Sequence, residues 1–373
     1  MSSDIEQKRI VIKIGSSSLT SRHGEISHRK LEKLACEVVT LKDAGHEVVL
    51  VSSGAVAAGY RKLGCLERPT TLTEKQAAAS IGQGLLMETY SKLFMSNGYV
   101  ASQILITRSD FLDEIRYKNV RNTLNVLLKR GIIPIVNEND TVTIDRLKFG
   151  DNDTLSAKVA SIVDADQLII LSDIDGLFDG HPGLNKNAKL IPQVNQITPE
   201  IEAVAGDSDS SVGTGGMRSK IEAVKIALAS GIPTFLGNAS KDQIAVNALS
   251  GKARGTYFTI EKPQIQLNQK KKWIAFHSHP EGEIIIDQNA KERMVDDHVD
   301  LTLSGIHDVK GPFNKGSVIR ILDKSGRKIG CGVVKVSSKE LQTLKKKVDT
   351  PSVNKTIIDS TDFVCHEKVL ITV

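Results

Sequence analysis

Three small polar side chains follow a glycine near the middle of the chain, in the run Gly150-Asp151-Asn152-Asp153. A helical pattern of apolar residues begins directly afterwards, which places Asp153 at the expected N-cap of a helix. Carboxylate and amide groups at a helix start suit a bound polar ligand that carries positive groups. A capped loop without a ligand is the alternative, and this run alone does not decide between them.

Two lysines stand at positions that are unusual for lysine. Lys13 interrupts the apolar run of residues 9–14, which is typical of a buried parallel strand. A buried ammonium group must be paired or must face a ligand. Lys13 therefore either extends to water from the strand end or points at a phosphate from the carboxyl end of the strand. Lys220 stands at the start of a predicted helix and supplies a second positive charge.

Several predicted strands end in small polar residues. Residues 9–14 lead into Gly15-Ser16-Ser17-Ser18, and residues 47–51 lead into Ser52-Ser53-Gly54. Such turns direct free backbone amides toward an anion. The glycine-rich run 213–216 before Lys220 also leaves amides exposed, although it is neither a Walker A loop nor a dinucleotide fingerprint. Taken by itself, that run fits a flexible surface turn equally well.

Phosphoryl transfer requires the kinds of residue found here. It needs cations where charge spreads over the transferred group, amides around the phosphates, and groups that orient the nucleophile. The sequence presents no Ser–His–Asp set and no Cys–His pair for nucleophilic catalysis. The missing dinucleotide fingerprint disfavours hydride transfer.

The elements that position these residues follow a repeating order of strand, polar cluster and helix. Strands are predicted at residues 9–14, 47–51, 99–106, 132–136, 167–171, 232–236 and 255–260, with helices at about 31–41, 73–97, 110–130 and 221–228. This order predicts a doubly wound, mostly parallel sheet sandwiched by helices, with the ligand crevice at the carboxyl ends of the strands. Residues 142–149 are expected to form a small hairpin.

A second domain is predicted after a polar linker at residues 261–272. Beyond it, short alternating strands separated by glycine turns indicate a small, mostly-β, barrel-like domain at residues 273–373. The first domain is then predicted at residues 8–260.

Composition excludes several classes of protein. Hydrophobic residues make up 40% of the 373 residues, enough for a substantial core, while aromatic residues make up only 4%. No apolar run approaches the ~18 residues of a membrane span. The four cysteines are scattered, so we expect reduced thiols and a cytoplasmic protein without a zinc site. The net charge of +5 favours a solvated surface over an RNA partner.

Five motifs, taken together, resemble the glutamate 5-kinases of the amino acid kinase family. The motifs are Val11–Ser17, Ser52–Ala55, Ile135–Asp140, Phe149–Asp153 and Gly213–Lys220. Their order and spacing match along residues 8–260, and the part from Trp273 onward resembles the PUA domain that many bacterial members carry. Asn-Glu-Asn-Asp with Gly-Asp-Asn-Asp is the discriminating pair, since Lys-Ile-Gly-Ser is shared with sister kinases.

The resemblance implies ATP-dependent phosphorylation of the side-chain carboxylate of L-glutamate, the first step toward proline. By matching position, Lys13 and Lys220 would contact the phosphates and stabilise the transition state, and Asp153 would orient both lysines. The residues expected to hold glutamate are Ser53, Gly54, Asp140 and Asn152. Those expected to bind the nucleotide are Lys13, Ser172, Asp173, Thr214, Gly215, Gly216, Met217, Arg218, Ser219 and Lys220. Mg²⁺ would be held mainly by the nucleotide phosphates and water, not by a protein metal site.

The resemblance also implies partners. A homo-oligomer is expected, and so is contact with glutamyl-phosphate reductase, because the acyl phosphate is labile. Two alternatives stay open at this point. One is a sister kinase that acts on aspartate, N-acetylglutamate or a nucleotide monophosphate. The other is an RNA-binding protein that uses its PUA domain, which the low aromatic content and the modest basic charge of the C-terminal third disfavour as the main role.

Overall fold

The structure is a computed structural model that describes residues 6–21, 25–143, 152–180, 182–183, 185, 187–206, 216–259, 267–346 and 355–366. These residues fall into two compact units. The second unit contains residues 111–114 and the described residues after 262. The first unit contains all the other described residues. Each unit has its own hydrophobic core.

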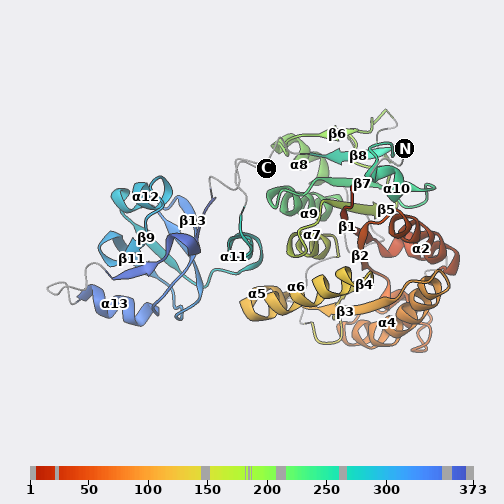
Figure 1. Ribbon diagram of the computed structural model, residues 1–373, viewed down its shortest axis with the longest axis horizontal. Coiled ribbons are helices and arrows are strands. Elements are labelled where there is room, and N and C mark those ends of the chain that lie inside the picture. The colour runs from red at the N-terminus through yellow and green to blue at the C-terminus, as the bar shows by residue number, and fades with distance from the viewer. Residues whose placement is uncertain are drawn as a thin grey trace. The chain divides into compact units, whose positions relative to one another are not determined.

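An eight-stranded sheet forms the centre of the first unit, with the strand order β3-β4-β2-β1-β5-β7-β8-β6 (Figure 1). The strands are β1 (Arg9–Ile14), β2 (Glu47–Ser52), β3 (Ala101–Ile106), β4 (Ile133–Glu138), β5 (Gln167–Ser172), β6 (Gln193–Val194), β7 (Thr234–Asn238) and β8 (Gly255–Phe258). Neighbouring strands run parallel except β7 and β8, which are antiparallel. The predicted fold, a mostly parallel sheet with helices on both faces, is confirmed.

Helices follow the strands in alternation and cover both faces of this sheet (Figure 1). They are α1 (Ser16–Leu19), α2 (His28–Asp43), α3 (Ala55–Gly59), α4 (Leu72–Met95), α5 (Arg108–Leu112), α6 (Glu114–Lys129), α7 (Asn152–Ile162), α8 (Pro199–Gly206), α9 (Met217–Ala229) and α10 (Ile244–Leu249). Ile10, Ile12 and Ile14 of β1 pack in one core cluster with apolar residues of α2, α4 and α10. Because side chains alternate along a strand, Lys13 points to the opposite face. That face is covered by α7, which carries Asp153.

Two details of the predicted helices are wrong. Residues 110–130 form two helices, because Asp113 interrupts the helical structure between α5 and α6. Asp110 accepts bonds from the Thr107 amide (2.7 Å) and hydroxyl (2.6 Å). These bonds lie at the N-terminal end of α5 and fix where that helix begins. Helix α7 begins at Asn152, so Asp153 lies in its first turn instead of at the N-cap, and its carboxylate pairs with Lys13 and Lys220. The predicted hairpin at 142–149 lies mostly outside the described residues.

The second unit is a mixed sheet with the order β11-β9-β12-β13-β15, accompanied by the strand pair β10–β14. Its elements are α11 (Gln269–Lys272), η2 (Trp273–His277), β9 (Glu283–Ile286), α12 (Gln288–Val295), β10 (Leu301–Thr302), η3 (Leu303–Gly305), β11 (Ile306–Lys310), β12 (Val318–Leu322), β13 (Lys328–Val333), α13 (Ser338–Lys346), β14 (Thr356–Ile358), η5 (Ser360–Asp362) and β15 (Phe363–Cys365). The predicted β-rich C-terminal module is therefore present.

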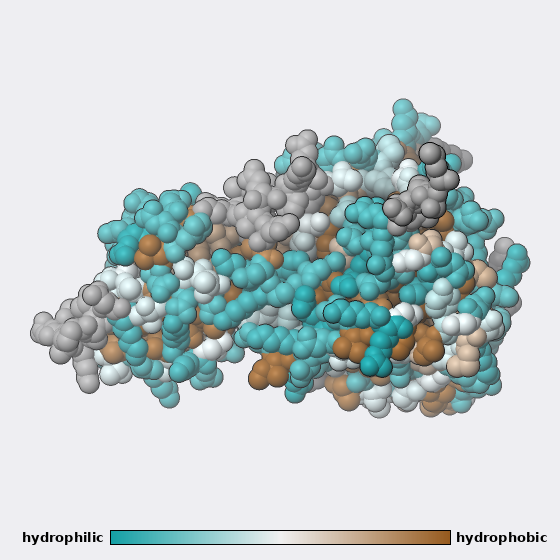
Figure 2. All heavy atoms as spheres, viewed as in Figure 1, coloured by the Kyte–Doolittle hydropathy of each residue, from teal (hydrophilic) through white to brown (hydrophobic). Residues whose placement is uncertain are grey.

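The surface is largely hydrophilic in the view of Figure 2, with apolar residues in smaller groups between the polar ones. The most exposed large apolar side chains are Leu66, Ile115 and Met95. None of the described helices is both long and apolar enough to cross a bilayer.

Candidate active site

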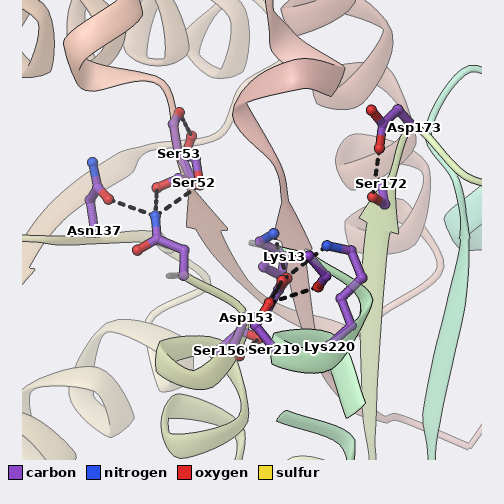
Figure 3. Close-up of polar contacts among 12 residues, drawn as sticks. Lys13, Ser52, Ser53, Asn137, Asp153, Ser156, Ser172, Asp173, Ser219 and Lys220 are labelled. Atoms are coloured by element: carbon purple, nitrogen blue, oxygen red, sulfur yellow. Dashed lines mark hydrogen bonds and ion pairs between the residues drawn. The ribbon is translucent and has the colours of Figure 1, made fainter. Parts of the chain in front are cut away.

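Two lysines from distant parts of the sequence converge on one buried carboxylate. Lys13 of β1 forms an ion pair with Asp153 Oδ1, and Lys220 Nζ of α9 lies 3.2 Å from Asp153 Oδ2 (Figure 3). Asp153 is completely buried, and each lysine is only 5% exposed. Ser219 donates a hydrogen bond of 3.2 Å to the same Oδ2 atom. The cluster thus carries one more positive charge than negative, which favours a bound anion.

The electrostatics keep Asp153 ionised. Burial acts to raise the pKa of its carboxyl, but the ammonium groups of Lys13 and Lys220 outweigh this effect, so the pKa lies below its ordinary value. An ionised carboxylate between the two lysines fixes both ammonium groups in position. In such a preorganised cluster, charge that develops on a transferred group is stabilised without reorganisation.

A second polar cluster begins at the neighbouring residue of the same helix. Asn152 Nδ2 is within hydrogen-bond distance of the Ser52 carbonyl (2.8 Å), Ser53 Oγ (3.0 Å) and Asn137 Oδ1 (2.9 Å). Ser52 is the last residue of β2, Ser53 comes directly after it, and Asn137 belongs to β4. The carboxyl ends of two adjacent strands therefore meet the start of α7 (Figure 3). Gly54 follows with a φ of 103°, a left-handed conformation that glycine adopts without strain.

The remaining predicted residues are placed as follows. Ser172 ends β5 and donates a bond of 3.0 Å to Asp173 (Figure 3), beside the strand that carries Lys13. Gly216 is the N-cap of α9, and Ser219 and Lys220 lie in the first turn of this helix. The residues between them are half-buried Met217 and exposed Arg218. Asp140 lies in the turn after β4, whereas Thr214 and Gly215 lie outside the described residues.

Asn137 of the second cluster, and two polar residues of α4 that lie next to the cluster, were not predicted as site residues. Asn137 donates to Gln83 Oε1 of α4 at 2.8 Å, and buried Tyr90 of α4 is 2.8 Å from the Ser52 hydroxyl. Burial raises the pKa of the Tyr90 phenol. Asn137 belongs to a motif recognised in the sequence, but Gln83 and Tyr90 lie within a long helical pattern that gives no signal of their role. Among the described residues, no group of three or more His, Cys, Asp or Glu side chains is placed to hold a metal ion.

The doubly wound sheet and the lysine–carboxylate cluster at its carboxyl edge are together suited to transfer of a phosphoryl group. The sequence pattern of the amino acid kinase family matches residues 8–238, and the chain belongs to this family. The pattern of the PUA domain matches residues 282–351 within the second unit.

Curated relatives match over nearly the whole chain. "Glutamate 5-kinase 2" of Bacillus subtilis is 62% identical over 98% of both chains. "Glutamate 5-kinase" of Streptococcus pneumoniae strain 70585 is 43% identical over 91% of this chain and 92% of its own. Among solved structures, the carbamate kinase from Giardia lamblia bound to AMP-PNP is 17% identical, with a TM-score of 0.51 over 69% of this chain and 99% of its own. This last likeness concerns the fold alone.

Proposed function

We propose that this protein uses ATP to phosphorylate the side-chain carboxylate of L-glutamate, giving glutamyl 5-phosphate, the first step of proline biosynthesis. One observation carries the proposal. The first two residues of α7 belong to two different polar clusters, since Asn152 bonds to Ser53 and Asn137 while Asp153 pairs with Lys13 and Lys220. An acceptor pocket and a phosphate pocket are thereby joined at adjacent residues. The names of the relatives at 62% and 43% identity support glutamate as the acceptor.

The chemistry needs no general base. A glutamate side chain has a pKa near 4.3, so its carboxylate is already ionised at neutral pH. One carboxylate oxygen attacks the γ-phosphorus, the bond to the β,γ-bridging oxygen breaks, and ADP leaves with that electron pair. Lys13 and Lys220 offset the negative charge on the transferred group, and Asp153 holds their ammonium groups in place.

The other predicted roles extend this proposal. Ser53, Gly54, Asp140 and Asn152 form the glutamate pocket, in which the Asp140 carboxylate pairs with the substrate's α-ammonium group. The residues from Thr214 to Lys220 and the Ser172–Asp173 pair contact the nucleotide. Asp153 is already paired with two lysines, so Mg²⁺ would be held mainly by the nucleotide phosphates and water, and it would supply further positive charge there.

We extend the proposal to the protein's surroundings on the same grounds. The resemblance to glutamate 5-kinases supports a homo-oligomer, and the scattered cysteines support a cytoplasmic location. Contact with glutamyl-phosphate reductase fits an enzyme whose acyl phosphate product is labile. The proposal also divides the chain into a catalytic domain at residues 8–260, a linker at 261–272 and a PUA-like domain at 273–373.

Trapping the product with hydroxylamine tests the function. The protein is incubated with ATP, Mg²⁺ and hydroxylamine, and with L-glutamate, L-aspartate or N-acetyl-L-glutamate in parallel, while a coupled assay follows ADP release. We expect the hydroxamate to form fastest with L-glutamate. Faster formation with another acceptor would assign the protein to a sister activity. ADP release with a nucleotide monophosphate, and no hydroxamate from any amino acid, would refute carboxylate phosphorylation.

A further inference from the structure

The segment that follows β5 is tied at its two ends to β7 and β8. It runs from Ser172 to Leu177 and contains Ser172 and Asp173, the proposed nucleotide contacts. The Ala239 N–H, just after β7, donates to the Ser172 carbonyl at 2.8 Å. The Leu177 N–H donates to Thr256 Oγ1 of β8, also at 2.8 Å. These two bonds fix the two ends of the segment.

A side chain of β7 reaches the middle of this segment. Asn238 is the last residue of β7 and lies opposite Ser172 in the parallel register with β5. Its Nδ2 atom lies 2.9 Å from Asp175 Oδ1 and 3.4 Å from the Asp173 carbonyl oxygen. Arg254 Nε lies 3.7 Å from Asp175 Oδ2, but the arginine side chain is 70% exposed, so this ion pair contributes little. Asn238 therefore holds the middle of the segment against the sheet.

The amide of Asn238 has a fixed direction. The Ser240 N–H donates to Asn238 Oδ1 at 2.9 Å, and a backbone N–H can only donate. The NH₂ group of Asn238 must therefore face Asp175, whose carboxylate, when ionised, can only accept. A side chain satisfies both partners only if it accepts on one side and donates on the other. Asparagine meets this requirement, whereas aspartate and leucine do not.

The C-terminal part of the segment has little room to move. Gly176 has a φ of 147°, and a Cβ atom there would lie 2.7 Å from both Leu190 Cδ1 and Thr256 Oγ1. Asp173, in contrast, is exposed, and its carboxylate accepts a bond of 3.0 Å from the Ser172 hydroxyl. A shift in the middle of the segment would thus move Asp173, at the surface proposed to bind the nucleotide.

We propose that Asn238 and Asp175 form a positioning pair that holds Ser172 and Asp173 in the conformation that binds the nucleotide. This inference rests on the proposed function and specifies which residues behind the nucleotide site determine its affinity. The Asn238 amide reaches Asp173 directly at its carbonyl and indirectly through Asp175, two residues farther on. Neither residue of the pair contacts the reacting atoms, so the pair affects nucleotide binding without affecting the acceptor.

Binding of the ATP analogue AMP-PNP with Mg²⁺, measured by calorimetry, tests the pair without any acceptor. Asn238→Leu removes the donor and leaves the net charge unchanged. We expect the Kd for AMP-PNP and the KM for ATP to rise about tenfold, the scale for loss of a hydrogen bond to a charged group. The KM for L-glutamate and kcat at saturating ATP should stay as in wild type. Asn122→Leu, at an exposed position of α6, is the matched control and should bind AMP-PNP as wild type does.

Exchanging the two side chains separates their hydrogen bond from packing and charge. Asn238→Asp still accepts from the Ser240 N–H but sets a second carboxylate against Asp175, so the Kd should rise more than in Asn238→Leu. In Asn238→Asp/Asp175→Asn the donor and the acceptor change places, and the Kd should return close to the wild-type value. Asp242, whose side chain is 97% exposed and pairs with Lys33, supplies the charge control. Asn238→Asp/Asp242→Asn has the same net charge as the exchanged pair but should bind as weakly as Asn238→Asp.

The outcomes are distinguishable. If the wild type binds AMP-PNP but forms no hydroxamate from L-glutamate, the proposed function fails, and binding still decides on the pair. If the wild type binds no AMP-PNP, both fail. If it binds and Asn238→Leu binds equally tightly, or the exchanged pair binds as weakly as Asn238→Asp, the positioning role is wrong. Should Asn238→Leu not fold, the comparison of the two double variants still decides.

Discussion

At the residue scale, the fully buried carboxylate of Asp153 holds two lysines that are more than 200 residues apart in sequence. Buried ion clusters contribute little net stability, because desolvation offsets the attraction between the charges. Removing only one partner of such a cluster lowers the stability strongly, because the remaining charges stay buried and unpaired. Asp153 therefore serves the fold and the site together.

Replacing this carboxylate is expected to destabilise the first unit. In Asp153→Asn two buried ammonium groups lose their counter-charge, which costs about 3–5 kcal/mol in the free energy of unfolding. The pKa of Asp153 is lowered in the folded state, so its stabilising effect is fully present above about pH 4 and is lost as the pH falls through the folded-state value. Denaturant titrations from pH 7 to pH 3 check this. A difference between variant and wild type that does not shrink at low pH would contradict it.

Asp140 is expected to act on substrate affinity instead of on the chemical step. Asp140→Asn removes the charge that we propose pairs with the substrate ammonium group, so the KM for L-glutamate should rise about tenfold or more, as for loss of a charged hydrogen bond. The KM for ATP should stay as it is. Steady-state kinetics in both substrates would show this, and an unchanged KM for L-glutamate would remove Asp140 from the pocket.

Sequence motifs predicted the three charged residues that the structure brings together around Asp153, but not the amides of Asn137 and Gln83. Lys13 was identifiable because a lysine inside an apolar strand is anomalous, and Asp153 because it lies in a polar cluster at a helix start. Gln83 was not identifiable, because a glutamine in a long helix is ordinary and its bond with Asn137 depends on which strand end packs against it. That contact is a property of the tertiary structure alone.

At the element scale, the crossing of α3 and α4 brings their backbones into contact. A Cβ atom on Gly82 would lie 1.8 Å from the Ala55 carbonyl oxygen, and one on Gly59 would lie 1.9 Å from that of Ala78. Ala55 directly follows Ser53 and Gly54, and Gly82 directly precedes Gln83. This crossing therefore sets the distance between the two sides of the proposed glutamate pocket.

An added methyl group at this crossing should disturb the pocket. Gly82→Ala forces α3 away from α4, and we expect a loss of about 1–3 kcal/mol in the free energy of unfolding, as for overpacking, together with a raised KM for L-glutamate. Gly84→Ala on the same helix is the matched control. A Cβ there meets nothing within 4 Å, and the better helix propensity of alanine should stabilise the protein by up to about 1 kcal/mol. Equal stability of the two variants would show that the crossing tolerates a side chain.

The periodic patterns predicted the order of strands and helices well, because long apolar alternation dominates the choice of element. They failed at the ends of elements. The local hydrogen bonds of Asp110 lie at the start of α5, and an interruption at Asp113 divides one predicted helix into two. The carboxylate of Asp153 pairs with lysines. Such pairing between distant residues cannot be seen in a linear pattern.

At the scale of the whole molecule, all described residues of the two polar clusters belong to the first unit. Within the second unit, Phe111 stacks on His277 with ring centroids 5.4 Å apart, and its carbonyl accepts a bond of 3.0 Å from Trp273 Nε1. Residues 111–114 thus belong to the second unit, although they are far in sequence from the other residues of that unit.

A protein that ends at residue 262 should accordingly keep its chemistry but lose stability. We expect phosphoryl transfer to persist. The melting temperature should fall because Phe111, which is 1% exposed in the full-length protein, loses its packing partners. In the shortened protein the uncovered Phe111 ring should also lower the solubility, and Phe111→Ser should restore it. Hydroxamate formation and thermal unfolding measure the two properties separately. Complete loss of transfer by a folded shortened protein would show that the second unit takes part in the chemistry.

The most direct test of the central claim is a single-turnover transfer of labelled γ-phosphate from ATP to L-glutamate, trapped as the hydroxamate, in wild type and Lys220→Met. Loss of one electrostatic donor at the transferred group costs about 3 kcal/mol, so the variant should be slower by on the order of 100-fold. Lys225→Met, which changes a lysine farther along α9, should match wild type. A Lys220→Met rate within a few-fold of wild type, or transfer that does not depend on L-glutamate, would contradict the account.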